Sequence, residues 1–297
     1  RFCYHKHLSV VASCRMCLVE IKGMKFAQPA CSTKVMDNMK IFTNSEKTKK
    51  AQKSTMEFLL INHPLDCPIC DQGGECELQD VSLDYGDGHS KYTQIKRVIL
   101  DRDISPLVST DMTRCIHCSR CVRFGEEISL NKELGLLDRG EDMKIDTFIN
   151  QGIKSELSGN MIDLCPVGAL NNKPYRYSAR TWDLIQNPGI SPHDCIGSNI
   201  YYHTYKNKIV RAIPKENESI NQTWISDRDR FGFEGIYSDE RVNTPLIREN
   251  KILKECDWDT AYEAINKKLE NLNKEKNNKD LGCFISPQST CEELFLF

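Results

Sequence analysis

The chain has 297 residues, of which 39% are hydrophobic and 28% charged, and its formal net charge at pH 7 is only −2. This length exceeds that of a typical single domain, and the nearly balanced charge gives no electrostatic reason to expect binding to nucleic acid. The longest apolar runs, such as F-L-L-I at residues 58–61, are too short to cross a bilayer. A membrane role would therefore depend on partner subunits.

Cysteine is the most informative residue type in this sequence. Eleven of the 15 cysteines, together with one histidine, fall into three groups within the first 165 residues. The long stretches without cysteine and the Cys-x2-Cys pairs differ from the dense spacing of small disulfide-bonded proteins. The pattern predicts a reducing compartment and a row of metal centres.

Residues 1–43 are expected to form a partial [2Fe–2S] ferredoxin-type domain with short strands at 17–21 and 40–43. Its beginning should be missing, because Arg1 and Phe2 directly precede the first ligand. Thiolates suit iron–sulfur clusters and zinc alike, but zinc ribbons usually combine two Cys-x2-Cys pairs and this region has one. The first ligand set is Cys3, Cys14, Cys17 and Cys31.

A helix is predicted at the start of the next region, residues 44–104. Residues 43–46 (T-N-S-E) have the form of a capping box, and His63-Pro64 should end the helix after residue 62. The apolar face of this helix is expected to contain Ala51, Thr55, Phe58 and Leu59.

The second ligand set follows this helix and consists of His63, Cys67, Cys70 and Cys76. A lone histidine is more often structural than ligating, but this one stands beside three cysteines that lack a fourth partner. Gly73 and Gly74 allow the backbone to approach a cluster closely. A [4Fe–4S] centre with one histidine ligand, which would raise its potential, is the favoured hypothesis. The alternative is a zinc site with the same four ligands.

Residues 105–190 are expected to form a ferredoxin-like [4Fe–4S] domain built on short helices. In bacterial ferredoxins a Cys-x2-Cys-x2-Cys run continues to a fourth cysteine followed by proline. This chain has Gly125 at that place, and its Cys-Pro pair comes later, at residues 165–166. The third ligand set is therefore Cys115, Cys118, Cys121 and Cys165.

Charged residues around the third set allow two interpretations. Arg114, Arg120 and Arg123 either raise the potential of a nearby thiolate cluster or are ordinary surface charge. His117 lies inside the first Cys-x2-Cys pair and is expected to face solvent rather than to bind metal.

The last third of the chain changes character. Residues 191–256 are predicted to be mainly β, with a hairpin of strands 199–204 and 208–213. A helix with Asp257 as its N-cap and a strand at 281–286 indicate the start of an α/β domain, expected to be truncated at residue 297.

Motifs for bond-making chemistry are missing from the sequence. There is no glycine-rich nucleotide fingerprint and no Ser/His/Asp or paired-carboxylate signature. Four isolated cysteines are interpreted as buried or incidental thiols: Cys195, Cys256, Cys283 and Cys291. Redox centres without a catalytic site favour electron transfer within this polypeptide.

Taken together, these segments resemble the large iron–sulfur subunits of respiratory complex I, NADH:ubiquinone oxidoreductase. The resemblance extends from Arg1 to about Trp258 and rests on runs such as C-R-M-C-L-V-E, H-P-L-D-C-P-I-C-D-Q-G-G-E-C, T-R-C-I-H-C-S-R-C-V-R-F and L-C-P-V-G-A-L. The twelve residues of the three ligand sets match the ligand positions of the family.

The resemblance implies a multidomain α+β fold. In chain order it comprises a β-grasp [2Fe–2S] ferredoxin domain at 1–43, a [4Fe–4S] domain with one histidine and three cysteine ligands at 44–104, a ferredoxin-like [4Fe–4S] domain at 105–190, a β-rich molybdopterin-oxidoreductase-like domain without its cluster at 191–256, and the start of a molybdopterin-oxidoreductase-like α/β domain at 257–297. The fourth of these domains is expected to lack a cluster because only Cys195 is present there.

The resemblance also implies a role and a location. Electrons would enter from a flavin-bearing, NADH-binding subunit and pass the first, third and second centres towards quinone-proximal iron–sulfur subunits and ubiquinone. The expected site is the matrix side of the mitochondrial inner membrane or the cytoplasmic face of a bacterial plasma membrane. This chain is expected to act as an enzyme subunit without a complete active site, and to bind no flavin, nicotinamide, molybdopterin or nucleic acid.

Two alternatives remain open. The first is the electron-input module of an NAD-linked hydrogenase or a formate dehydrogenase, although such proteins typically keep two complete ferredoxin runs. The second is a zinc-stabilised structural module without a redox role.

Overall fold

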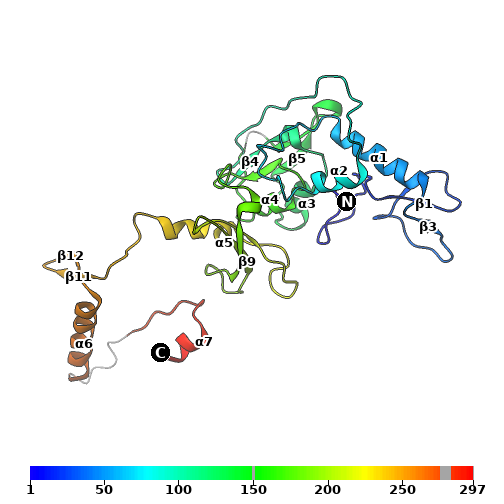
Figure 1. Ribbon diagram of the computed structural model, residues 1–297. Coiled ribbons are helices and arrows are strands. Elements are labelled where there is room, and N and C mark those ends of the chain that lie inside the picture. The colour runs from blue at the N-terminus through cyan, green and yellow to red at the C-terminus, as the bar shows by residue number, and fades with distance from the viewer. Residues whose placement is uncertain (149–150, 275–281, 297) are drawn as a thin grey trace.

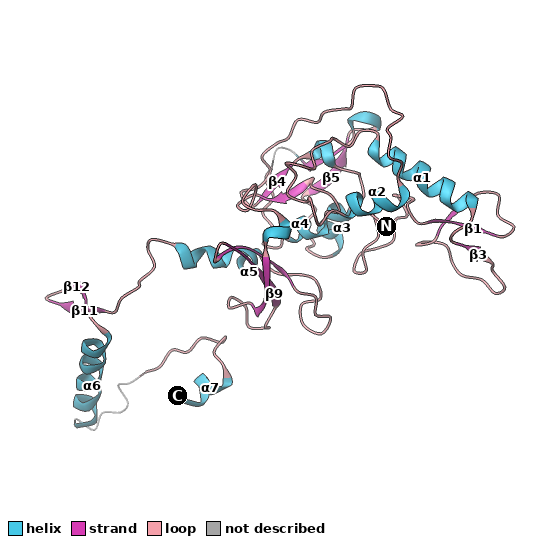
Figure 2. Ribbon diagram, viewed as in Figure 1, coloured by secondary structure: helices cyan, strands magenta, loops and turns pink. Residues whose placement is uncertain are grey.

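The computed structural model describes residues 1–148, 151–274 and 282–296. Most elements form one main body, whereas β11, β12, α6 and α7 lie apart from it (Figure 1). Short helices and strands alternate with long loops throughout the body (Figure 2).

The N-terminal region contains a small antiparallel sheet in the order β2–β1–β3. Its strands are β1 (Leu18–Ile21), β2 (Gln28–Pro29) and β3 (Ile41–Phe42). The strands expected at 17–21 and 40–43 are confirmed, and β2 was not predicted because two residues display no alternation. Leu18 pairs with Pro29, and the N–H of Ala30 donates to the Cys17 carbonyl at 3.0 Å. This pairing brings Cys17 and Cys31 to the same end of the sheet.

Helix α1 (Glu46–Leu60) is confirmed, but its cap and its buried face differ from the prediction. Ser45 is the N-cap and accepts from the Thr48 N–H at 3.2 Å. The prediction that Phe58 lies on the buried face is wrong, because Phe58 is 74% exposed while Thr48 and Met56 are buried. The Thr48 hydroxyl accepts from the N–H of Glu20 in β1 and donates to the carbonyl of Phe42 in β3. One buried polar side chain therefore satisfies a backbone group in each of two strands.

Helix α2 (Glu77–Tyr85) begins directly after Cys76. The end of α1 is held by Lys96, which lies on the loop that follows α2. The ammonium group of Lys96 donates to the carbonyls of Leu60, Ile61 and His63 at 2.8–2.9 Å. Carbonyls at a helix C-terminus lack partners within the helix, and a cation satisfies them. Lys96 thereby fixes the backbone of His63.

The ferredoxin-like region combines two strand pairs with short helices. Its elements are β4 (Val108–Thr110), η1 (Met112–Arg114), α3 (Arg120–Glu127), β5 (Leu134–Leu137), η2 (Gly140–Asp142), β6 (Lys144–Thr147), α4 (Asn160–Leu164) and β7 (Leu170–Asn172). β4 pairs with β7 and β5 with β6, both antiparallel. The main hydrophobic core lies here and includes predicted ligands of all three sets among its buried residues.

A second antiparallel sheet, in the order β10–β9–β8, follows η4 (Thr181–Asp183). The predicted hairpin is confirmed as β9 (Asn199–Tyr205) and β10 (Lys208–Pro214). Lys206 and Asn207 both have positive φ, 49° and 63°, which matches the right-handed twist of a tight hairpin. The edge strand β8 (Ile185–Ile190) was not predicted because its central Asn-Pro-Gly has low strand propensity.

This second sheet region is joined to the ferredoxin-like region by buried polar contacts. The Asp227 carboxylate, at the start of α5 (Asp227–Phe231), accepts from the N–H groups of Ser158 and Gly159 at 3.1 and 2.7 Å. Asn160 is fully buried, and its side-chain amide pairs with both the N–H and the carbonyl of Ile225 at 3.0 and 2.7 Å.

The remaining elements are η5 (Gly232–Tyr237), β11 (Leu246–Glu249), β12 (Ile252–Glu255), α6 (Trp258–Lys274) and α7 (Cys291–Leu296). The helix with Asp257 at its start is confirmed, with the Thr260 N–H donating to the Asp257 carboxylate at 2.7 Å. The strand expected at 281–286 begins outside the described residues, and 282–286 form no strand, since no neighbouring strand pairs with them. Among the described helices, none combines the length and apolarity needed to span a bilayer.

The Asn160 contacts predict a stability effect. Replacement of Asn160 by Ala leaves the N–H and carbonyl of Ile225 buried without their partners, which costs roughly 2–4 kcal/mol. We expect the urea unfolding of Asn160→Ala, monitored by circular dichroism, to have a lower midpoint than that of the unaltered protein. Replacement of the exposed Asn44 by Ala should leave the midpoint nearly unchanged, and equal effects of the two substitutions would contradict the role of Asn160.

Candidate iron–sulfur centres

The second ligand set converges on one cavity. His63, Cys67, Cys70 and Cys76 all line a partly enclosed space with an empty volume of about 280 Å³. His63 follows α1, Cys67 and Cys70 lie on a turn in which the Cys70 N–H donates to the Asp66 carbonyl at 2.8 Å, and Cys76 is the N-cap of α2. Two helix ends and one turn therefore direct four ligands of the expected types to a common space.

His63 has the chemical state that a metal ligand requires. Burial, reinforced by the charges of Lys96 and Arg114, lowers the pKa of His63 to about 4, so its imidazole is neutral at physiological pH. Its Nδ1 is buried and has no hydrogen-bond partner in the described part of the chain. A neutral imidazole with an unpaired ring nitrogen suits metal coordination.

The backbone at Gly168 closes this cavity from the other side. A Cβ atom at Gly168 would lie 2.1 Å from the Sγ atom of Cys70, so any other residue here would have to displace that sulfur. Arg114 also lines the cavity and donates to the carbonyl of Gly168 at 3.2 Å. Although Arg114 directly precedes the third set in the sequence, its positive charge therefore lies at the second set.

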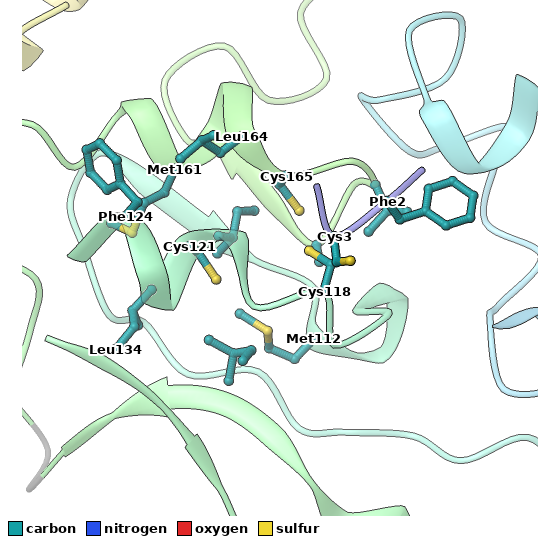
Figure 3. Packing of buried hydrophobic residues seen from close by; sticks show 14 of the residues in the cluster. Phe2, Cys3, Met112, Cys118, Cys121, Phe124, Leu134, Met161, Leu164 and Cys165 are labelled. Atoms are coloured by element: carbon teal, nitrogen blue, oxygen red, sulfur yellow. The ribbon is translucent and has the colours of Figure 1, made fainter. Parts of the chain in front are cut away.

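The third ligand set lines a separate cavity. Cys115, Cys118, Cys121 and Cys165 surround an empty volume of about 350 Å³ together with apolar side chains. In Figure 3 the side chains of Cys121 and Cys165 point towards the same space from α3 and from the segment after α4. The distant Cys165 thus lines the same cavity as the three closely spaced cysteines.

Local backbone geometry shapes this third site. His117 and Ser119 adopt left-handed conformations, with φ of 52° and 57°, which turn the chain between successive cysteines. The His117 N–H donates to the Cys115 sulfur at 3.4 Å. Burial raises the pKa of the Cys115 and Cys118 thiols to about 12, so ionised thiolates require a compensating cation.

The structure excludes one of the two interpretations of the arginines and corrects the expectation for His117. Arg114, Arg120 and Arg123 are all buried, at 4–5% exposure, and are not surface charge. His117 is half-buried, and its ring nitrogen contacts the Met143 carbonyl at 2.9 Å instead of facing solvent freely. The burial of these side chains results from the way the loops pack, which the spacing of residues in the sequence does not predict.

The first ligand set forms two neighbouring pairs. A hydrogen bond with Cys14 lowers the pKa of the Cys3 thiol to about 4, and the same contact raises the pKa of Cys14. Burial and contact with Cys17 raise the pKa of Cys31 to about 11, and the Cys3 charge acts on Cys31 as well. All four thiols therefore lie within interaction range, with Cys3 and Cys14 buried.

The third set is in contact with the regions of both other sets. The Cys76 thiol of the second set contacts the carbonyl of Pro166, the residue after Cys165, at 3.7 Å. On the other side, Arg120 on α3 donates to the carbonyls of Arg1 and Tyr4, which flank Cys3, at 3.2 and 3.0 Å.

The isolated cysteines do not join these sites. Cys195, Cys283 and Cys291 are exposed and Cys256 is half-buried, so the expectation that they are buried is wrong, although an incidental role remains. Within the described ranges, no three His, Cys, Asp or Glu side chains meet the geometry for one metal ion.

The donor chemistry of the three sets fits iron–sulfur clusters. Each set offers soft sulfur donors, the ligands of two sets line a common cavity each, and a backbone N–H group points at a ligand sulfur of the third set. A row of ferredoxin-type domains with such sites defines a multi-centre iron–sulfur protein.

Comparison with known families gives the particular class. Family models match consecutive segments: a 2Fe-2S iron-sulfur cluster binding domain at 1–46, the NADH-ubiquinone oxidoreductase-G iron-sulfur binding region at 52–91, the ferredoxin-like domain of NADH-quinone oxidoreductase subunit 3 at 105–171, the NDSU1/NuoG-like 4Fe-4S domain at 188–234 and molybdopterin oxidoreductase at 241–297. These matches confirm the expected fold class. The segment 188–234 contains one cysteine, Cys195.

Similar proteins agree with these matches. The chain is 47% identical over its full length to the NADH-ubiquinone oxidoreductase 75 kDa subunit of Reclinomonas americana, and 46% identical over 97% of its length to the corresponding NADH-quinone oxidoreductase subunit of Rickettsia typhi. It spans 42% of the length of each of these relatives. The chain belongs to the family that comprises the 75 kDa subunit of NADH-ubiquinone oxidoreductase and its bacterial NADH-quinone oxidoreductase counterparts.

A solved structure shares part of the fold. A chain of an NAD+-reducing [NiFe]-hydrogenase, crystallised in its H2-reduced state, superposes with a TM-score of 0.54 at 26% sequence identity. The match covers 60% of this chain and 77% of the hydrogenase chain.

The close approach at Gly168 predicts a local loss of metal. In Gly168→Ala the new Cβ must displace the Cys70 sulfur, so we expect iron and acid-labile sulfide to fall by about one tetranuclear cluster, with the signals of the other sites retained. The matched control is Gly235→Ala, where a Cβ meets nothing within 4 Å. Full iron content in Gly168→Ala would contradict the placement of Cys70 at the site.

Proposed function

We propose that this chain is an electron-transfer subunit in the peripheral arm of NADH:ubiquinone oxidoreductase. It relays electrons that originate from NADH through one [2Fe–2S] cluster on the first ligand set and two [4Fe–4S] clusters on the second and third sets. The observation that carries this proposal is the convergence of twelve predicted ligands into three sets, of which the third adjoins both others. The clusters supply one-electron redox chemistry when bound.

The contacts between the sets support the order first, third, second. Electron tunnelling favours short, bonded routes, and the third set offers one to each neighbour through Pro166 and through the residues that flank Cys3. The residues of this chain shield the third set from water, since Cys118, Cys121 and Cys165 lie within the hydrophobic core.

Partners and location follow from the family. The relatives are named as subunits of NADH-quinone or NADH-ubiquinone oxidoreductase. We infer that a flavin-bearing, NADH-binding subunit donates electrons and that quinone-proximal iron–sulfur subunits accept them. The chain would then act on the matrix side of the mitochondrial inner membrane, or on the cytoplasmic face of a bacterial plasma membrane, as an enzyme subunit without a complete active site of its own.

A hydrogenase electron-input module is the second candidate. The similarity to the NAD+-reducing [NiFe]-hydrogenase chain supports a shared electron-input architecture. Its 26% identity is well below the 46–47% found with the oxidoreductase subunits, which favours the first candidate. The zinc alternative is disfavoured because tetrahedral zinc draws four ligands to about 2.0–2.3 Å from one ion, and no three His, Cys, Asp or Glu side chains of the described residues are arranged in that way.

Metal analysis and low-temperature EPR of the reduced protein test the cluster assignment. We expect about ten iron atoms per chain, and signals from one binuclear and two tetranuclear clusters. Zinc without iron or acid-labile sulfide would eliminate the relay, and a single cluster type would refute the three-centre arrangement.

The histidine ligand can be tested separately. In His63→Cys a thiolate replaces the neutral imidazole and adds negative charge, so we expect the cluster to assemble with a lower midpoint potential in an EPR-monitored redox titration. The control is His89→Cys, at an exposed position of the loop after α2. An unchanged potential in His63→Cys would mean that His63 is not a ligand.

A further inference from the structure

Arg123 occupies the junction between the first and third ligand sets. It lies on α3, two residues after Cys121, and is only 5% exposed. Its Nη2 donates to the carbonyl of Cys3 at 2.5 Å and to the carbonyl of Cys118 at 3.3 Å. One guanidinium group therefore bridges a ligand residue of the first set and a ligand residue of the third.

The other contacts of Arg123 fix this geometry. Its Nη1 donates to the carbonyl of Ser9 on the loop between Cys3 and Cys14, and its Nε donates to the Ser119 hydroxyl at 3.3 Å. The planar, rigid fork of a guanidinium group can hold several carbonyls at once, which the single ammonium of lysine does less well.

The charge of Arg123 has no carboxylate partner within 4 Å in the described ranges of the chain, in contrast to its neighbours. Arg114 pairs with Asp66 at 3.0 Å, and Arg120 pairs with Glu77 at 2.6 Å. A buried cation without a counter-charge is costly. Arg123 contacts the carbonyls of Cys3 and Cys118, and the side chains of these two residues become thiolates when clusters bind.

We propose that Arg123 is a positioning residue that couples these two centres: it holds the Cys3 loop against the Cys118 loop, and its charge is balanced by both clusters. This inference rests on the proposed function. With clusters bound, Arg123 would offer an electron that passes between the first and third sets a route from the Cys3 carbonyl through the guanidinium to the Cys118 carbonyl. The shared cation stabilises the reduced, more negative state of both centres.

Redox titration of the complete complex, monitored by EPR, tests whether the charge of Arg123 acts on the potentials of both centres. In Arg123→Gln we expect the reduction equilibria of the [2Fe–2S] cluster and the all-cysteine [4Fe–4S] cluster each to become at least tenfold less favourable, a change of about 59 mV for one electron. The histidine-ligated cluster should keep its potential. Arg123→Lys retains the charge and should shift both potentials less than Arg123→Gln does.

The matched control is Arg102→Gln, which removes a cation of the same region that pairs with Asp146 at 3.1 Å and should leave all three potentials unchanged. Unchanged potentials of the first and third centres in an Arg123→Gln protein with full iron content would overturn the proposal. A shift in the potential of only one of these two centres would also overturn the proposal.

A measurement on the unaltered complex covers the case in which Arg123→Gln does not assemble. Pulsed EPR should detect a magnetic interaction between the reduced [2Fe–2S] and all-cysteine [4Fe–4S] clusters that is stronger than that between the [2Fe–2S] and histidine-ligated clusters. A weaker interaction would overturn the coupling through Arg123. Absence of the cluster signals themselves would instead overturn the proposed function, so the two failures are distinguishable.

Discussion

The close approach of two ligand sets at residues 165–168 is the constraint on which much of the structure depends. Cys165 lines the third cavity, whereas Gly168, three residues later, lies against the Cys70 sulfur of the second. The position of this segment is fixed by the pairing of β7 with β4 and by the Asn171 amide, which donates to the Gly168 carbonyl at 2.9 Å. This short stretch of backbone therefore determines how far apart two proposed redox centres can lie.

Buried arginines provide the second organising element. Arg211 joins β10 to Glu75 beside the second set through two hydrogen bonds of 2.8 Å, and Arg230 joins α5 to Asp163 on α4. A fold made of short helices and loops leaves many main-chain carbonyls without regular partners, and a guanidinium group can satisfy several of them together. The relative positions of the ligand sets thus depend on fixed cations more than on a continuous sheet.

Local signals account for the elements that the sequence predicted correctly. The hairpin of β9 and β10 combines strand-forming residues with a Lys206-Asn207 turn, and α6 has Asp257 as its cap. The prediction failed where partners are distant in sequence. The buried face of α1 is defined by Thr48, whose hydroxyl bonds to β1 and to the end of β3, and a two-residue strand such as β2 exists only through pairing with β1.

The sequence by itself determined which side chains are the candidate ligands, because cysteine spacing and residue chemistry are properties of the chain alone. It also grouped Cys165 with Cys115, Cys118 and Cys121, through the Cys-Pro pair. Only the tertiary structure decided that Arg114 serves the second cavity and that Arg123 bridges the first and third sets. The physical reason is that such contacts join segments up to 120 residues apart, and their geometry depends on how the domains pack rather than on local spacing.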